Sequence, residues 1–182
     1  MKSINLIKSV LMMMAMSIVC GTFFTSCGGN DDEDSPGGGG GSTTIGVHRI
    51  DIQIDGKTNS NWTSAFSFLA MTADGKFTGL YENGKSLPVD PQLNVWSTDE
   101  IRDFSISTDK NAATMVGNVL LTAPGGSKAT EDVVITMVGY VNNNRIYTRV
   151  FTLPAGKSII GISFSTGDGG KSECSVDGTI TQ

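Results

Sequence analysis

The residue with the clearest setting for chemistry is Cys27, because its thiol directly follows two small residues at the end of an apolar run. The chain has two other cysteines. Cys20 lies inside the apolar run and follows the branched residues Ile18 and Val19. Cys174 alternates with apolar residues near the end of the chain, which favours a small buried side chain over a reactive thiol. Cys27 is therefore the candidate for modification.

Residues 1–26 have the pattern of a cleaved export signal. Lys2 and Lys8 supply positive charge, and an apolar run of about 15 residues follows from Val10 to Phe24. A transmembrane helix needs roughly 20 apolar residues to cross the hydrocarbon of a bilayer. The sequence therefore predicts a leader that is removed just before Cys27.

The residues around this boundary resemble the signal of bacterial lipoproteins, in which an apolar residue and two small residues precede an acylated cysteine. Phe24, Thr25 and Ser26 fit that pattern, with Phe24 where leucine is more usual. The resemblance implies that the signal peptidase recognises these three residues and that Cys27 carries the lipid. Only Cys174 then remains as a free thiol, so no internal disulfide is expected.

An acidic cluster follows the cysteine and consists of Asp31, Asp32, Glu33 and Asp34. It resembles the export signal of Bacteroidota lipoproteins, although the acids of that signal usually stand closer to the cysteine. The resemblance implies recognition by the lipoprotein export machinery and a lipid-anchored position at the outer membrane, facing the cell exterior. The alternative is that these acids only keep a linker solvated.

Residues 27–44 are expected to form a flexible linker, since five consecutive glycines occupy positions 37–41. Residues 45–182 are long enough for one domain with its own core. Without the leader, the chain has 11 basic and 18 acidic residues, a formal charge of −7. No basic cluster is present to neutralise phosphates, which argues against nucleic-acid binding.

Few residues are suited to catalysis. The single histidine, His48, excludes metal sites with two histidines, and we expect neither a metal nor another cofactor. The segment from Gly79 to Ser86 matches the written P-loop pattern, but Pro88 and Pro91 follow where a helix would be required. We interpret Asn83-Gly84 within that segment as a hairpin turn. The sequence favours a protein that is not an enzyme, with a small extracellular hydrolase as the least favoured alternative.

The segment from residue 45 onward predicts an all-β domain of about nine or ten strands, because short runs rich in apolar residues alternate with turn signals. We expect strands at residues 50–54, 66–71, 77–81, 93–96, 104–107, 114–122, 133–141, 146–153, 159–164 and 174–181. Residues 133–141 are apolar on both faces, as in a strand within a packed layer. An antiparallel β-sandwich is favoured, and a closed barrel of lipocalin type is the alternative.

Two tryptophans suggest the function. Trp62 and Trp96 lie among Asn, Ser, Thr and Asp residues, a setting in which an indole can stack on a sugar ring. We therefore expect a binding module for a glycan, another polymer or a surface protein. The alternative for both indoles is that they fill the ends of the core. A structural subunit that assembles through a free strand edge is the alternative function.

Overall fold

The computed structural model describes residues 44–56, 62–123, 127–167, 171–176 and 179–181, the last two segments by their backbone only. These residues contain no helix. The strands are β1 (His48–Asp55), β2 (Thr63–Thr72), β3 (Leu80–Glu82), β4 (Lys85–Ser86), β5 (Trp96–Thr98), β6 (Phe104–Thr108), β7 (Ala112–Thr122), β8 (Val133–Val141), β9 (Asn144–Leu153), β10 (Ile159–Ser165), β11 (Lys171–Val176) and β12 (Thr179–Thr181).

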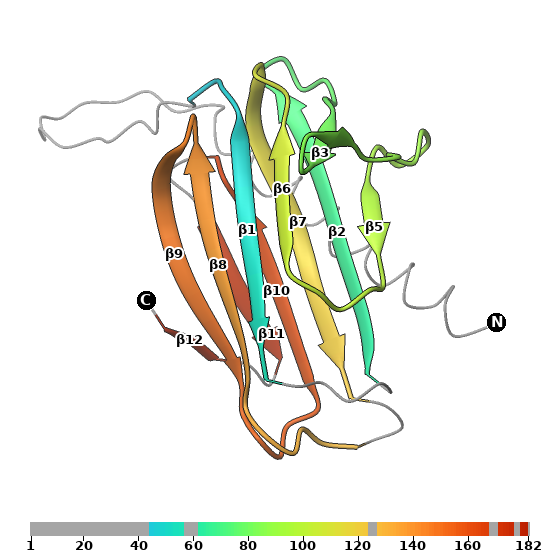
Figure 1. Ribbon diagram of the computed structural model, residues 1–182, viewed down its shortest axis with the longest axis vertical. Helices are drawn as coiled ribbons and strands as arrows, with labels where there is room; N and C mark the ends of the chain where they lie inside the picture. The colour runs from blue at the N-terminus through green and yellow to red at the C-terminus, as the bar shows by residue number, and fades with distance from the viewer. Residues whose placement is uncertain (1–43, 57–61, 124–126, 168–170, 177–178, 182) are drawn as a thin grey trace, which may run out of the picture.

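Two antiparallel sheets pack face to face (Figure 1). The seven-stranded sheet, here the large sheet, has the order β12-β9-β8-β1-β6-β3-β4 and lies in front in Figure 1. The five-stranded sheet, here the small sheet, has the order β11-β10-β7-β2-β5. The sheets do not close into a barrel. The prediction of an all-β sandwich is therefore confirmed, and the lipocalin-type alternative is wrong.

The core lies between the two sheets and is built by strand alternation, which sends every second side chain inward. Ile50 and Ile52 point inward from β1, and Phe66 and Phe68 point inward from β2. The rings of Phe66 and Phe104 have their centroids 4.6 Å apart, so aromatic contacts join the two sheets. Because side chains alternate along a strand, the residues between these inward-facing ones must face outward.

Two predicted hairpin turns are confirmed by backbone geometry. Asn83 and Gly84 both have positive φ, 50° and 77°, and connect β3 to β4. Asn142 and Asn143 have φ of 49° and 65° and connect β8 directly to β9. Asparagine and glycine tolerate this left-handed region better than other residues, which explains why these dipeptides signalled the turns.

Three of the expected strands were wrong in detail. The strand expected at 93–96 begins only at Trp96, because the chain between Pro91 and Leu93 forms a turn. The strand expected at 174–181 is divided into β11 and β12, which belong to different sheets. The outward residues of β8 are partly exposed, so β8 does not lie within a packed layer as its apolar sequence suggested.

Candidate functional site

A row of polar and aromatic residues crosses the outer face of the large sheet. The strand registers place five residues side by side on β3, β6, β1, β8 and β9, namely Tyr81, Ser107, Arg49, Tyr140 and Arg145. Four steps between neighbouring strands give this row a width of about 19 Å. Arg49, Tyr81 and Ser107 lie opposite the core face, because their chain neighbours Ile50, Leu80 and Ile106 point inward. Tyr140 alternates in the same way with the buried Val141, and the exposed Arg145 pairs with Tyr140 across a register irregularity. We call these residues the outer row.

Arg49 occupies the centre of the outer row and is held by its neighbours. Its guanidinium carbon lies 4.0 Å from the centre of the Tyr140 ring. Its Nε lies 3.3 Å from Oδ1 of Asp51, which is a charge contact without hydrogen-bond geometry. Ser105 donates a hydrogen bond of 2.7 Å to the same carboxylate oxygen. The Arg49 and Asp51 side chains keep 33% and 36% exposure, so both can contact a ligand from a position already fixed.

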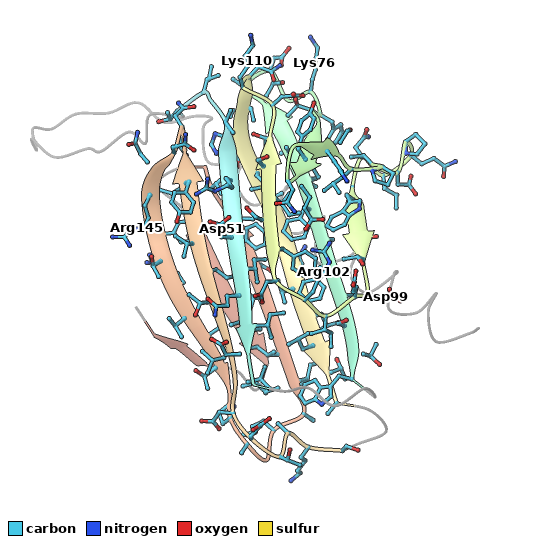
Figure 2. The ribbon with its side chains drawn as sticks, viewed as in Figure 1. Asp51, Lys76, Asp99, Arg102, Lys110 and Arg145 are labelled. Carbon is cyan, nitrogen blue, oxygen red and sulfur yellow. The ribbon has the colours of Figure 1, made fainter. Side chains whose placement is uncertain are left out.

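Figure 2 shows how this face is laid out, with Asp51 near its centre and Arg145 and Arg102 toward its two sides. Arg145 is exposed, whereas Arg102 is engaged by carboxylates. Nη2 of Arg102 donates to Glu82 at 2.8 Å, and its Nε donates to Glu100 at 3.1 Å. The Glu82 contact raises the pKa of Arg102, and we assign this residue a structural role.

Asp109 fixes the end of the outer row at Tyr81. Its carboxylate accepts hydrogen bonds from the Tyr81 hydroxyl at 2.8 Å, the Thr78 hydroxyl at 2.9 Å and the Gly79 backbone N–H at 3.0 Å. Burial opposes ionisation of Asp109, but the three hydrogen bonds outweigh it and lower the pKa of this carboxyl. The bond to Asp109 raises the pKa of Tyr81. The phenol therefore stays neutral and its ring is held in one place.

The structure places Trp96 in the core, which corrects the sequence-based prediction of an exposed indole. It is 8% exposed, and its ring centroid lies 5.6 Å from that of Phe68 and 6.3 Å from that of Phe104. A ring enclosed in this way has no free face for a sugar. Trp62 is partly exposed and packs against the edge of the core, so its part in ligand binding stays a prediction.

His48 is buried and hydrogen-bonded through both ring nitrogens. Nε2 contacts the carbonyl oxygen of Thr44 at 3.0 Å, and Nδ1 contacts the Thr166 hydroxyl at 2.7 Å. A carbonyl only accepts, so Nε2 carries the proton and Nδ1 accepts from Thr166. That hydroxyl also accepts the backbone N–H of Met115 at 2.9 Å. Burial lowers the pKa of His48, and the neutral ring joins β1 to β7 and to the segment after β10.

The other predicted site residues lie outside the described residues: Phe24, Thr25, Ser26, Cys27, Asp31, Asp32, Glu33 and Asp34. The side chain of Cys174 is likewise not described. In the described part of the chain, no three His, Cys, Asp or Glu side chains come together as a metal site would require. No helix within these residues is long and apolar enough to cross a membrane.

Sequence reasoning missed the outer row, although part of the signal was present. The alternation of Ile50, Asp51, Ile52 and Gln53 already sends the polar side chains of β1 to the surface. The strand partners of Arg49 come from β6 and β8, and the row reaches β3 through β6. These pairings depend on a register that one strand alone does not reveal.

Comparison with known proteins supports the fold. No family of known sequences matches the chain, and no curated protein is significantly similar to it. A DUF4425 family protein from Bacteroides ovatus superposes with a TM-score of 0.55 at 20% identity, covering 73% of this chain and 99% of that one. A DUF4425 domain of unknown function from Bacteroides vulgatus gives 0.54 at 20% identity, with coverage of 72% and 97%. At this identity the likeness concerns the fold alone.

Proposed function

We propose that the protein is a non-catalytic binding module for a glycan, anchored by lipid at the outer membrane and facing the cell exterior. The observation that carries the binding proposal is the outer row, in which Arg49 and Tyr140 are held together, with Asp51 beside Arg49 on the same open sheet face. Carboxylate, guanidinium and hydroxyl groups can bond sugar hydroxyls, while the tyrosine rings offer apolar faces. The row is wide enough for several sugar rings.

A glycan array probed with the processed chain tests this proposal. We expect binding to at least one polysaccharide, and Arg49→Ala should weaken it by about 1–3 kcal/mol, the range for loss of an anchor residue. Lys76→Ala is the matched control, since Lys76 is a highly exposed cation at a turn and pairs with Asp74 across that turn. Equal binding by the Arg49 variant and the parent would remove the outer row as the site.

The lipid anchor is proposed from the sequence around Cys27. Cys27→Ala should abolish incorporation of a radiolabelled fatty acid and leave the leader uncleaved. Replacing Asp31, Asp32, Glu33 and Asp34 with Ala should retain the lipid but protect the protein from protease added to intact cells. Labelling of the Cys27→Ala variant would contradict acylation at this cysteine. Unchanged protease cleavage of the variant without the four acids would show that these acids only keep the linker solvated.

A second candidate function is assembly through a strand edge. β12 pairs with β9 only at Val150, Phe151 and Thr152, so Asn144–Arg149 have no strand partner on that side among the described residues. An unpaired edge of this kind can accept a strand from another chain. Sedimentation of the processed chain would support this alternative if oligomers formed and would oppose it if only monomers were found.

A further inference from the structure

Charge is distributed unevenly across the outer face of the large sheet. The hairpin of β8 and β9, residues 133–153, contains two arginines and no acidic residue. The other side of the sheet contains Glu82 at the end of β3, and Asp103 and Asp109 stand immediately before and after β6. Figure 2 shows Arg145 at one side of this face. The face therefore has a basic side at β8 and β9 and an acidic side at β6 and β3.

Two arginines flank the same tyrosine on the basic side. Tyr140 of β8 pairs with Arg49 of β1 on one side and with Arg145 of β9 on the other. Two steps between neighbouring strands place the Cα atoms of Arg49 and Arg145 about 10 Å apart. The guanidinium carbon of Arg49 lies 4.0 Å from the centre of the Tyr140 ring. The basic side thus presents two guanidinium groups beside one aromatic ring.

These two guanidinium groups keep hydrogen-bond donors for a ligand. Arg145 is exposed, and no ion pair to it occurs among the described residues. Arg49 has a carboxylate oxygen of Asp51 at 3.3 Å, but its guanidinium donates no hydrogen bond to a described residue. Arg102 differs from both, because two glutamates accept hydrogen bonds from its guanidinium. Free donors are therefore found on the basic side of the face.

Guanidinium groups bind an anion more strongly than a neutral hydroxyl. Their N–H donors form a fixed fork that matches the oxygens of a carboxylate, and a charge-assisted hydrogen bond is about twice as strong as a neutral one. A sulfate group offers the same negatively charged oxygens. Asp51 would repel an anion placed over β1, since like charges in contact are unfavourable. The place for an anion is therefore between Arg49 and Arg145, toward β9.

We propose that the outer row binds an acidic glycan, with a carboxylate or sulfate group between Arg49 and Arg145 and with neutral sugar rings extending toward Tyr81. This inference rests on the proposed glycan-binding function and names the class of glycan. The Tyr81 end suits neutral sugars, because the hydroxyl of Tyr81 donates to Asp109, whose negative charge would repel a second anion. The glycan therefore crosses the sheet in one direction, with its acidic group over β8 and β9.

Pairs of acidic and neutral polysaccharides test the proposal with the full chain. The array carries glucuronoxylan beside its carboxyl-reduced form and κ-carrageenan beside its desulfated form, so that carboxylate and sulfate are tested separately. We expect at least one acidic polymer to bind about tenfold more tightly than its neutral form, since hydrogen bonds to a charged group are lost. Equal binding of both forms would overturn this inference and leave glycan binding intact. Binding of none of the four polymers would contradict the proposed function as well.

Variants of Arg145 separate a specific anion site from general attraction to the protein. Arg145→Ala should weaken binding of the acidic polymer about tenfold, and Arg145→Lys should restore only part of the loss, because lysine keeps the charge but lacks the fork of donors. Lys128→Ala is the matched control, since Lys128 is an exposed cation in the connection between β7 and β8. Equal losses in the Arg145→Ala and Lys128→Ala variants would assign binding to net charge and overturn the proposal.

Asp51 provides a test in which binding should become tighter. Asp51→Asn removes a negative charge beside Arg49 and keeps a side chain of similar shape, so affinity for the acidic polymer should rise about two- to fivefold. A neutral glycan that used the Asp51 carboxylate as a hydrogen-bond acceptor would instead bind less tightly to this variant. A fall in affinity for the acidic polymer would contradict an anion placed between Arg49 and Arg145.

Discussion

The two outer faces of this sandwich differ more than its two inner faces do. On the large sheet, β1 alternates strictly, and its outward residues Arg49, Asp51 and Gln53 are polar. On the small sheet, β2 and β7 carry mainly apolar or small residues on both sides, with Asn118 as a buried polar exception. A strand with one solvated face alternates, whereas a strand covered on both faces reads as a continuous apolar run. In this sandwich, burial of the outer face therefore follows the sequence pattern of each strand.

The largest effect should come from placing a charge on each outer face. Val116→Asp in the full chain should cost more than about 4–5 kcal/mol of unfolding free energy or prevent folding, because the carboxylate would lack a partner and water. Val138→Asp on the large sheet should change the free energy of unfolding by no more than about 0.5 kcal/mol. Urea unfolding monitored by circular dichroism measures the stability of both variants. Similar losses of stability in the two variants would show that the two outer faces do not differ in burial.

The interior beneath both faces is tested by the tryptophans. Trp96→Ala removes a ring enclosed by Phe68 and Phe104 and should cost about 3–5 kcal/mol in stability. Trp62→Ala should cost less, since its ring is only partly buried. Thermal melts of the two variants compare them directly. A small loss for Trp96 would restore it as a candidate for ligand binding.

A smaller effect should come from His48, which connects the two sheets. His48→Ala removes the hydrogen bonds of the ring to the Thr166 hydroxyl and the Thr44 carbonyl, at about 0.5–1.5 kcal/mol for each. Burial lowers the pKa of His48, so the unfolded chain binds the proton more tightly than the folded chain. Stability should therefore decline as the pH falls below the unfolded value of about 6.5.

Urea midpoints between pH 7.5 and pH 5 check this pH dependence. His48 is the single histidine of the sequence, so His48→Ala should flatten the profile in that window. If the stability of the parent protein is constant across the same pH range, protonation of His48 does not destabilise the folded state and the prediction is wrong.

The smallest change in stability is expected for Arg49→Ala on the open face. Its exposed ion pair with Asp51 and its contact with Tyr140 should together contribute no more than about 1 kcal/mol. Denaturation midpoints of this variant and of the parent give the value. A loss comparable to that of Trp96→Ala would mean that Arg49 holds the sheet together and is unsuited to ligand binding.

The sandwich could be predicted from the sequence because its signals are local. The Asn83-Gly84 turn and the alternation around Ile50 act within a few residues. The outer row could not be predicted, since Arg49 meets Tyr140 only through the pairing of β1 with β8. Trp96 was misplaced for a related reason: its polar sequence neighbours lie on a short strand whose position over Phe68 is set by pairing with β2.

The pairing of β1 also has a consequence for the order in which the chain acquires structure. β1 lies between β6 and β8 in the large sheet, and the residues that complete it, such as Val141, come long after His48 along the chain. β2 and β7 are paired across a shorter segment, which still contains β3, β4, β5 and β6. Loops of this length must close before the sheets gain any pairing energy, and sandwiches of such topology fold in milliseconds to seconds. The N-terminal half thus has little to fold against until β6, β7 and β8 have been synthesised.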